Sequence, residues 1–237
     1  MRSLSIVIPA YNEEARLPST LDRVRDYVQS QNFGFCEIIV VDDGSRDGTA
    51  ALVERRDGIR LLKNPGNHGK GYTIRHGMLE AKGDWILYTD ADLSAPIEEL
   101  AKLLAAADRE NADVAIGSRA LDRSLVGVHQ SAFREASGRV FNLIMRLVTG
   151  LPFRDTQCGF KLFRAAAARE IFSRQKLDGF SFDVEDLVIA KSLGLRAIEV
   201  PVVWNNVEGT KVSMFSGVQS FIDLAGIRWR AIMGQYR

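Results

Sequence analysis

The chain has 237 residues, of which 46% are hydrophobic, 26% charged and 8% aromatic, with 31 Lys plus Arg against 30 Asp plus Glu. These values are typical of a soluble protein with one large domain, and they exclude a disordered tail, a collagen and a small disulfide scaffold. The two cysteines, Cys36 and Cys158, have no partner histidines at metal-ligand spacing, so we expect a reduced, cytosolic setting.

The charge is distributed unevenly along the chain. Residues 1–115 carry 14 Lys plus Arg against 19 Asp plus Glu, whereas the remainder carries 17 against 11, so an acidic half precedes a basic half. The basic half has no aromatic-interleaved basic stretch, and we therefore expect no nucleic-acid partner. No run of about 18 apolar residues occurs, so no bilayer-spanning helix is expected.

Short β-branched runs alternate with helical patterns through the first half. The alternation predicts an α/β fold with a Rossmann-like, mostly parallel central sheet flanked by helices. In such sheets ligands bind beyond the carboxyl ends of the strands. The predicted strands are residues 4–8, 37–41, 59–62, 85–89 and 113–117, and the predicted helices are residues 17–28, 49–56, 72–81 and 97–107.

Polar clusters follow three of the predicted strands, at residues 9–14, 42–49 and 90–92. Turn chemistry alone explains Asp43-Gly44 and Asp47-Gly48. Since the carboxyl ends of parallel strands share one edge, however, three acidic clusters there favour a ligand site.

Asp90 and Asp92 are two residues apart at the end of an apolar strand, so both carboxylates can face the same cation. The alternative is that Asp92 caps the following helix while Asp90 is solvated. We favour a metal site because of the position at the ligand edge. Hard oxygen ligands of this kind suit Mg²⁺ or Mn²⁺ that carries substrate phosphates.

The glycine-rich segment at residues 66–71 matches neither the dinucleotide fingerprint nor the P-loop pattern, which argues against a dehydrogenase and a P-loop NTPase. The segment either begins a helix or holds an anion on its backbone amides.

Taken together, these motifs resemble the family 2 inverting glycosyltransferases of the GT-A fold. The later motifs resemble the polyprenyl-phosphate branch, nearest to the dolichyl-phosphate β-glucosyltransferases and more distantly the dolichyl-phosphate mannosyltransferases. The resemblance covers nearly the whole chain. It lies in residues 8–13, 40–45, 69–71, 90–92, 117–119, 154–161, 182–185, Trp204 and 208–211.

The resemblance implies roles for individual residues and a divalent metal. Asp90 would contact the nucleotide and metal, and Asp92 would be the direct metal ligand; Ser94 stands where mannosyltransferase relatives often have a metal-binding Gln. Asp155 and Gln157 would lie beside the sugar, Arg119 and Arg134 would hold the acceptor phosphate, and Lys211 would close over the donor pyrophosphate. The remaining nucleotide-binding residues would be Pro9, Tyr11, Glu13, Asp42, Asp43, Lys70 and Gly71.

The expected reaction is transfer of a hexose to a dolichyl or other polyprenyl phosphate with inversion, and glucose from UDP-glucose is the favoured donor. A phosphate acceptor is already anionic and needs no general base. A hydroxyl acceptor, the first alternative, would require Asp186 or Glu185 as base. Further alternatives are mannosyl transfer from GDP-mannose and a silent subunit of a membrane complex, against which the intact Asp90 and Asp92 argue.

We expect a catalytic domain at residues 1–211, with a nucleotide-binding half at 1–115 and an acceptor half at 116–211. Residues 212–237 form an amphipathic helix with a single apolar sector. The pattern fits a helix in the membrane interface and a helix packed on the domain equally well. The resemblance favours a peripheral enzyme on the cytoplasmic face of a membrane. The apolar sector contains Val218, Phe221, Ile222, Ala225, Trp229, Ile232, Met233 and Tyr236.

Overall fold

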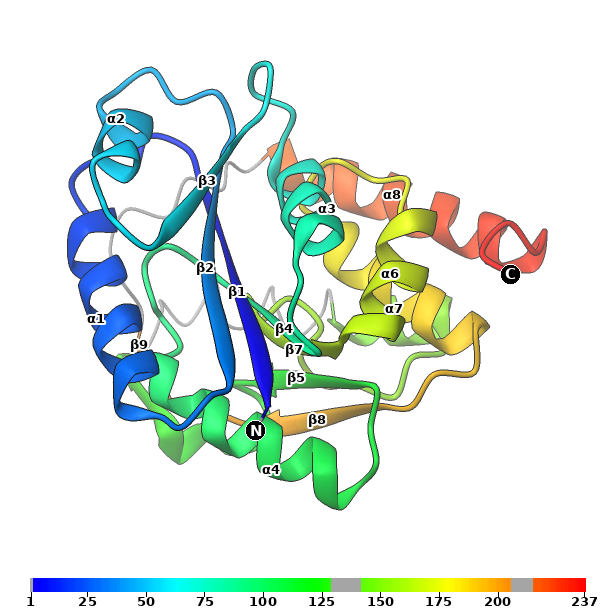
Figure 1. The fold of residues 1–237 in the computed structure, drawn as a ribbon. Helices are drawn as coiled ribbons and strands as arrows, with labels where there is room; N and C mark the ends of the chain where they lie inside the picture. The colour runs from blue at the N-terminus through cyan, green and yellow to red at the C-terminus, as the bar shows by residue number, and fades with distance from the viewer. Residues whose placement is uncertain (1, 129–141, 206–214) are drawn as a thin grey trace.

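The computed structural model describes residues 2–128, 142–205 and 215–237. Its described residues form a seven-stranded sheet in the order β3-β2-β1-β4-β7-β5-β8, with helices on both faces (Figure 1). The strands are parallel to their neighbours except for β7, which is antiparallel to both β4 and β5. This is the expected mostly parallel α/β sheet.

The strands of this sheet are β1 Ser3–Ala10, β2 Phe35–Asp42, β3 Ile59–Lys63, β4 Trp85–Thr89, β5 Val114–Ser118, β7 Phe160–Arg164 and β8 Ala197–Pro201. A second, two-stranded pairing joins β6 Val126–Val128 to β9 Trp204–Asn205. The five strands predicted for the first half are confirmed, and β4 has the predicted bounds at both ends.

The helices are α1 Leu17–Ser30, α2 Thr49–Glu54, α3 Lys70–Glu80, η1 Ile97–Glu99, α4 Leu100–Arg109, η2 Arg123–Leu125, α6 Ala165–Arg174, α7 Phe182–Ser192 and α8 Phe215–Ile232. Residues 142–149 are also helical. The helix predicted at residues 97–107 is divided, because a 3₁₀ turn (η1) precedes α4.

Two hydrophobic clusters cover the two faces of the sheet. Side chains of α1, α2 and α4 pack on one face, and those of α3, α6 and α7 pack on the other. The central strands β1, β4 and β5 are almost wholly buried. They therefore carry apolar residues in continuous runs, as expected of strands covered on both faces.

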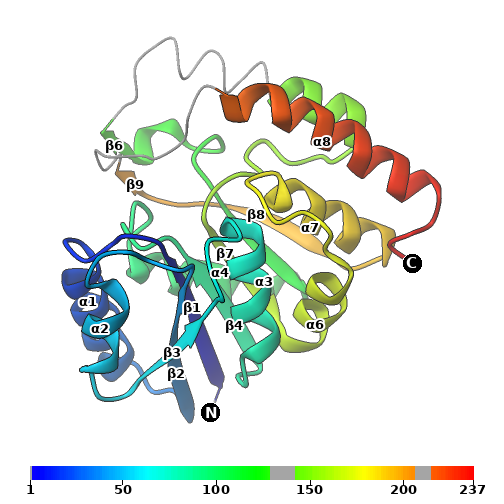
Figure 2. The same ribbon diagram turned by 90° about the horizontal axis from the view of Figure 1, so that it is seen from above.

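The C-terminal helix α8 packs on α7 at the edge of the molecule (Figure 2). Its inner side buries Leu224 and Ile227, which belong to the same core as α7. Its outer side leaves Trp229 and Ile232 exposed at 62% and 63%. One side of α8 therefore packs on the domain, and the apolar sector beside it faces solvent.

One member of the predicted apolar sector is placed differently. Tyr236 is fully buried, because the helix ends before it at a turn in which Gly234 has φ 70°. The positive φ of Gly234 ends the helical conformation and allows the chain to fold back toward α7. Among the described residues, no helix has the length and apolar composition needed to cross a membrane.

The packing of α3 on the sheet generates a first prediction. A Cβ at Gly77 would overlap the side chain of Val7 and lie 2.8 Å from Cγ2 of Val41, so α3 can approach β1 and β2 only with glycine there. We expect Gly77→Ala to destabilise the fold by about 1–3 kcal/mol, the usual range for overpacking. Chemical denaturation would measure this loss.

Gly226→Ala in α8 is the matched control, because its nearest atom would be the Arg230 side chain at 3.5 Å. It should leave stability unchanged or raise it by up to about 1 kcal/mol through helix propensity. Equal effects of both substitutions would contradict the tight packing of α3.

Candidate functional site

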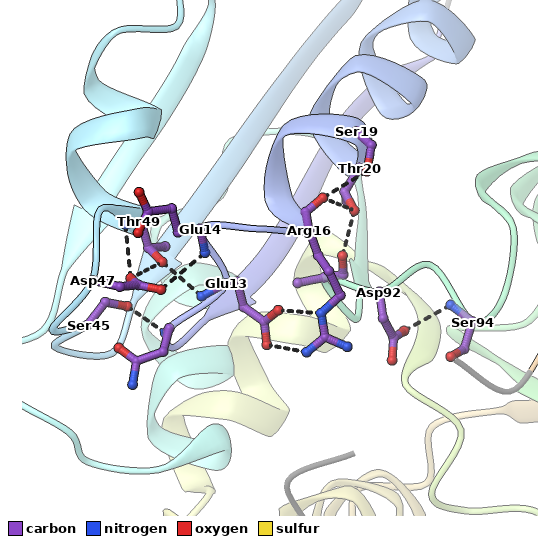
Figure 3. A network of polar contacts seen from close by, with 12 residues as sticks. Glu13, Glu14, Arg16, Ser19, Thr20, Ser45, Asp47, Thr49, Asp92 and Ser94 are labelled. Atoms are coloured by element: carbon purple, nitrogen blue, oxygen red, sulfur yellow. Dashed lines mark hydrogen bonds and ion pairs between the residues drawn. The ribbon is translucent and has the colours of Figure 1, made fainter. Parts of the chain in front are cut away.

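The ends of β1 and β2 are locked together by hydrogen bonds between the segments that follow them. Asn12 N donates to Ser45 Oγ at 2.9 Å, and Glu13 N donates to Thr49 Oγ1 at 2.8 Å. Arg46 N donates back to Asn12 Oδ1 at 2.8 Å. Figure 3 shows the bond between Glu13 and Thr49 beside the Glu13–Arg16 ion pair. The first two polar clusters therefore meet at one rim, as predicted.

The third cluster reaches the same rim through α1. Thr20 Oγ1 donates to the carbonyl of Ala91 at 2.5 Å, which ties the turn after β4 to the first turn of α1 (Figure 3). Pro9 and Tyr11, both partly exposed, lie at the start of the rim. The carboxylate of Glu13 is held by Arg16, with contacts of 2.8 and 3.1 Å.

Asp42 and Asp43 are both buried, yet their surroundings differ. Asp43 accepts from Asn64 Nδ2 at 2.8 Å and from the backbone N–H groups of His68 and Gly69 at 3.0 and 2.9 Å. Asp42 receives long bonds of 3.3 Å from Ser45 N. Asp43 thus fixes the glycine-rich turn, and Asp42 keeps more acceptor capacity for a ligand.

The glycine-rich turn places Lys70 beside the third polar cluster, residues 90–92. Gly69 has φ 100° and precedes α3, whose first residue is Lys70. Lys70 Nζ lies 2.6 Å from Asp90 Oδ1. Burial alone would lower the pKa of Lys70, but the negative charges of Asp90 and Asp183 raise it, so the lysine remains charged.

Asp90 and Asp92 are partly exposed at the end of β4. Asp90 N donates to the carbonyl of Gly159 at 3.1 Å, and Asp92 Oδ1 accepts from Ser94 N at 2.9 Å. Leu93 has φ 46°, a conformation that a residue with a side chain rarely adopts, and it turns the chain between Asp92 and Ser94. The side chain of Ser94, at the position expected for a further metal ligand, is buried. It therefore offers no exposed ligand here.

The donor set fits a hard divalent cation. Among the described residues there is no group of three or more His, Cys, Asp and Glu that could hold a metal ion by itself. Two carboxylates with open positions are what Mg²⁺ and Mn²⁺ use when substrate phosphates complete the coordination. Asp90 and Asp92 therefore suit a metal ion whose coordination is completed by the oxygens of a diphosphate.

The second half of the chain brings Arg119 and Asp155 into direct contact. Arg119 follows β5, and its Nε and Nη2 donate to the two carboxylate oxygens of Asp155 at 2.6 and 2.7 Å. The guanidinium also lies over the ring of Trp204, 4.7 Å from the centroid. Burial alone would raise the pKa of Asp155, but the charge of Arg119 lowers it, so both groups are ionised.

Sequence reasoning placed Arg119 on the acceptor phosphate and Asp155 beside the sugar, and it did not foresee that they pair. Glu199 on β8 positions this pair, since it accepts from Asp155 N at 2.8 Å and from Ser118 Oγ at 2.6 Å. Gln157 is exposed two residues after Asp155. Arg134 and Lys211 lie outside the described residues.

A buried charge network beneath the rim was missed by sequence reasoning. Lys161 on β7 is 0% exposed, and its ammonium contacts Asp183 of α7 and, at 2.6 Å, the hydroxyl of Tyr88. Tyr88 also donates to Asp183. The available signal was a lysine within the apolar strand Phe160–Arg164, where a charge must be paired if it is buried.

Glu185 and Asp186 do not fit the role of general base that a hydroxyl acceptor would require. Both are 0% exposed on α7. Glu185 accepts from Tyr236 OH at 2.6 Å and from two backbone N–H groups. Within the described part of the chain, neither carboxylate oxygen of Asp186 has a hydrogen-bond partner. Burial and the charges of Asp183 and Glu185 hold the pKa of Asp186 well above its usual range.

Comparison with known proteins agrees with this geometry. Residues 5–172 match the model of glycosyl transferase family 2. A dolichyl-phosphate beta-glucosyltransferase of Drosophila melanogaster is 37% identical over 99% of this chain and 77% of its own length. The Homo sapiens protein of the same name is 35% identical over 100% of this chain and 78% of its own.

Among solved structures, glucosyl-3-phosphoglycerate synthase from Mycobacterium tuberculosis in complex with UDP has a TM-score of 0.70 at 20% identity, over 96% of this chain and 80% of that one. The same synthase with Mn²⁺, UDP-glucose and phosphoglyceric acid also has a TM-score of 0.70, at 19% identity over 96% and 80%.

The sheet, its carboxylate-bearing rim and these matches define a glycosyltransferase of the GT-A fold. The chain belongs to glycosyl transferase family 2.

The contact between Gly159 and Asp90 generates a second prediction. A Cβ at Gly159 would overlap the Asp90 carboxylate. Because that carboxylate is the end of a side chain that can move, Gly159→Ala should displace Asp90 while the fold survives. We expect the affinity for Mn²⁺ with UDP to fall by about tenfold or more, the effect of losing one charged ligand.

Titration calorimetry would measure this affinity, and thermal unfolding would show that Gly159→Ala remains folded. An unchanged affinity would mean that the position of Asp90 does not matter for binding of metal and nucleotide.

A third prediction concerns pH. The unfolded chain releases the Asp186 proton near pH 4 (about 3.9), whereas the folded chain retains it, so stability falls as the pH rises from about 4 toward the raised folded pKa. Asp186→Asn imitates the neutral acid and removes this loss. Its stability relative to the wild type should therefore grow with pH when denaturation is measured from about pH 4 to about pH 8. A difference independent of pH would contradict the raised pKa.

Proposed function

We propose that this chain transfers glucose from UDP-glucose to dolichyl phosphate, or a related polyprenyl phosphate, with inversion at the anomeric carbon. The observation that carries the proposal is similarity over nearly the whole chain to proteins named dolichyl-phosphate beta-glucosyltransferase, at 35% and 37% identity. The charged groups of the rim supply what such a reaction needs.

On the donor side, Asp90 and Asp92 would hold Mg²⁺ or Mn²⁺, which supplies positive charge to the diphosphate leaving group when bound. Lys70, fixed 2.6 Å from Asp90, adds a cation beside the same carboxylate. Asp42 would accept a hydrogen bond from the nucleoside. These groups are held before the substrate arrives, so little reorganisation accompanies the development of charge.

On the acceptor side, Arg119 would bind the lipid phosphate. Its Nε and Nη2 are engaged by Asp155, and in the described contacts its Nη1 is left for a phosphate oxygen. The phosphate attacks as an anion, since its second pKa is about 6 by analogy with phosphorylated side chains. No base is needed, which agrees with the burial of Glu185 and Asp186.

The chain would reach its lipid acceptor at the cytoplasmic face of a membrane by laying α8 in the interface. The outer apolar side of α8 and of the turn after it consists of residues exposed at 45% to 63%: Phe221, Ile222, Trp229, Ile232 and Met233. A helix with one apolar side and adjacent arginines is typical of interfacial binding. Leu147, 77% exposed in the neighbouring helical segment, would add to the same contact.

The direct test of the proposed function, our fourth prediction, is transfer of radiolabelled glucose from UDP-glucose to dolichyl phosphate. The wild type with Mg²⁺ or Mn²⁺ should form a labelled lipid. Asp92→Asn, which keeps the shape of the side chain but removes its charge, should lower turnover by about a hundredfold or more. Removal of the metal by a chelator should have the same effect.

A parallel reaction with GDP-mannose separates the main alternative, because a mannosylated lipid in place of a glucosylated one would overturn the donor assignment. Absence of any lipid product from either donor would overturn the proposed acceptor.

A fifth prediction tests membrane binding. Replacing Trp229, Ile232 and Met233 together by Ser should lower co-sedimentation with anionic vesicles by more than about tenfold, since burial of each such side chain is worth roughly 1.5–3 kcal/mol. These side chains are exposed, so the fold should survive. Leu79→Ser on α3, where Leu79 is 42% exposed, is the control and should bind vesicles normally. Equal binding by all three proteins would contradict the interfacial role of α8.

A further inference from the structure

Glu185 is fully buried, and its carboxylate accepts hydrogen bonds from two described segments that are neither helix nor strand. Its Oε2 accepts from the backbone N–H groups of Lys176 and Leu177 at 2.9 and 2.7 Å. Its Oε1 accepts from Tyr236 OH, in the turn after α8, at 2.6 Å. Arg230 Nη1 of α8 lies 3.9 Å from the same oxygen. One side chain thus holds two separate segments.

The segment that Glu185 holds, residues 175–179, clasps the first turn of α3. The carbonyl of Asp178 accepts from Gly71 N at 2.8 Å and from Tyr72 N at 3.2 Å. Gln175 Nε2 donates to the carbonyl of Gly71 at 3.0 Å. Arg75, one turn further along α3, pairs with the Asp178 carboxylate at 2.9 Å. The N–H groups that begin α3 are therefore satisfied by a loop from the other half of the chain.

The glycines of this turn permit the close approach. A Cβ at Gly69 would lie 2.6 Å from the carbonyl oxygen of Asp178, and one at Gly71 would lie 2.6 Å from that of Leu177. The two backbones are thus in direct contact, with no side chain between them that could absorb a shift. A displacement of residues 176–179 must then move the start of α3.

The start of α3 carries Lys70, the partner of Asp90. From these contacts we infer that Glu185 is a positioning residue for the donor site: by fixing residues 176–179 against the first turn of α3, it holds Lys70 on Asp90. The inference rests on the proposed function only in taking Lys70 and Asp90 as the end of the site that receives the donor diphosphate. It also assigns Glu185 a task that needs no access to substrate.

Two substitutions separate positioning from other roles. Glu185→Leu has a similar volume but leaves the N–H groups of Lys176 and Leu177 without an acceptor. Glu185→Gln can direct its amide oxygen to those N–H groups and its NH₂ to the oxygen of Tyr236. Positioning therefore predicts damage by Leu and rescue by Gln, whereas a general base would be lost in both.

Hydrogen–deuterium exchange of the full chain without ligand is the first measurement. Glu185→Leu should speed exchange by about tenfold or more at residues 176–177 and also at Gly71 and Tyr72, and Glu185→Gln should restore protection at both places. Faster exchange at 176–177 with unchanged exchange at Gly71 and Tyr72 would overturn the inference, because the displacement would not reach α3. Exchange that rises throughout the chain in Glu185→Leu would overturn it as well, since Glu185 would then support the whole fold.

Titration calorimetry with UDP and Mn²⁺ is the second measurement. Glu185→Leu should weaken binding by about tenfold, as expected when one charged contact is misplaced, and Glu185→Gln should restore it. Wild-type affinity in Glu185→Leu would overturn the link to the donor site. Because neither measurement requires transfer of glucose to a lipid, failure of the transfer assay with these results intact would refute the proposed function alone.

Discussion

The ion pair between Lys70 and Asp90 is the contact on which the arrangement of the site depends. Parallel strands that end at one edge bring several carboxylates together, and like charges in a partly buried place repel one another strongly. Lys70, delivered by the start of α3 at 2.6 Å from Asp90, offsets part of that repulsion. The glycine turn, Asp43 and the clasp at residues 175–179 all serve to place this one ammonium group.

A buried or partly buried carboxylate is paired with a cation at two further places in the fold. Beneath the rim, Asp183 is neutralised by the buried Lys161, and after β5 Asp155 is neutralised by Arg119. A buried pair of this kind contributes little net stability, because removing both charges from water costs about as much as their attraction returns. The pairs instead fix the positions of these charges, so the proposed site would need little reorganisation when a substrate binds.

Much of the fold could be predicted from the sequence, because the strands of the first half are continuous apolar runs and their polar ends identify the ligand edge. The antiparallel β7 could not be predicted, since Lys161 interrupts its apolar pattern and only the tertiary partner Asp183 explains the lysine. The prediction that the polar clusters after β1, β2 and β4 lie at one edge of the sheet is confirmed. The pairing of Arg119 with Asp155 was not foreseen, because the two residues are 36 positions apart and meet only in the folded chain.

The C-terminal segment illustrates the limit of periodicity. A helical pattern shows which residues share a side, but burial depends on what that side meets. Leu224 and Ile227 meet α7, whereas Trp229 and Ile232 meet solvent, and Tyr236 leaves the helix altogether. Tyr236 then donates to Glu185, which connects the end of α8 to α7.

The central claim is that Asp90 and Asp92 receive a metal and a nucleotide diphosphate at the edge where Lys70 lies. Anomalous X-ray diffraction from crystals of the full chain grown with Mn²⁺ and UDP would test it most directly. The account predicts a single strong manganese peak bonded to a carboxylate oxygen of Asp92 and to the diphosphate of UDP, with the diphosphate beside the first turn of α3. A manganese peak or a nucleotide away from the carboxyl ends of β1, β2 and β4 would contradict it.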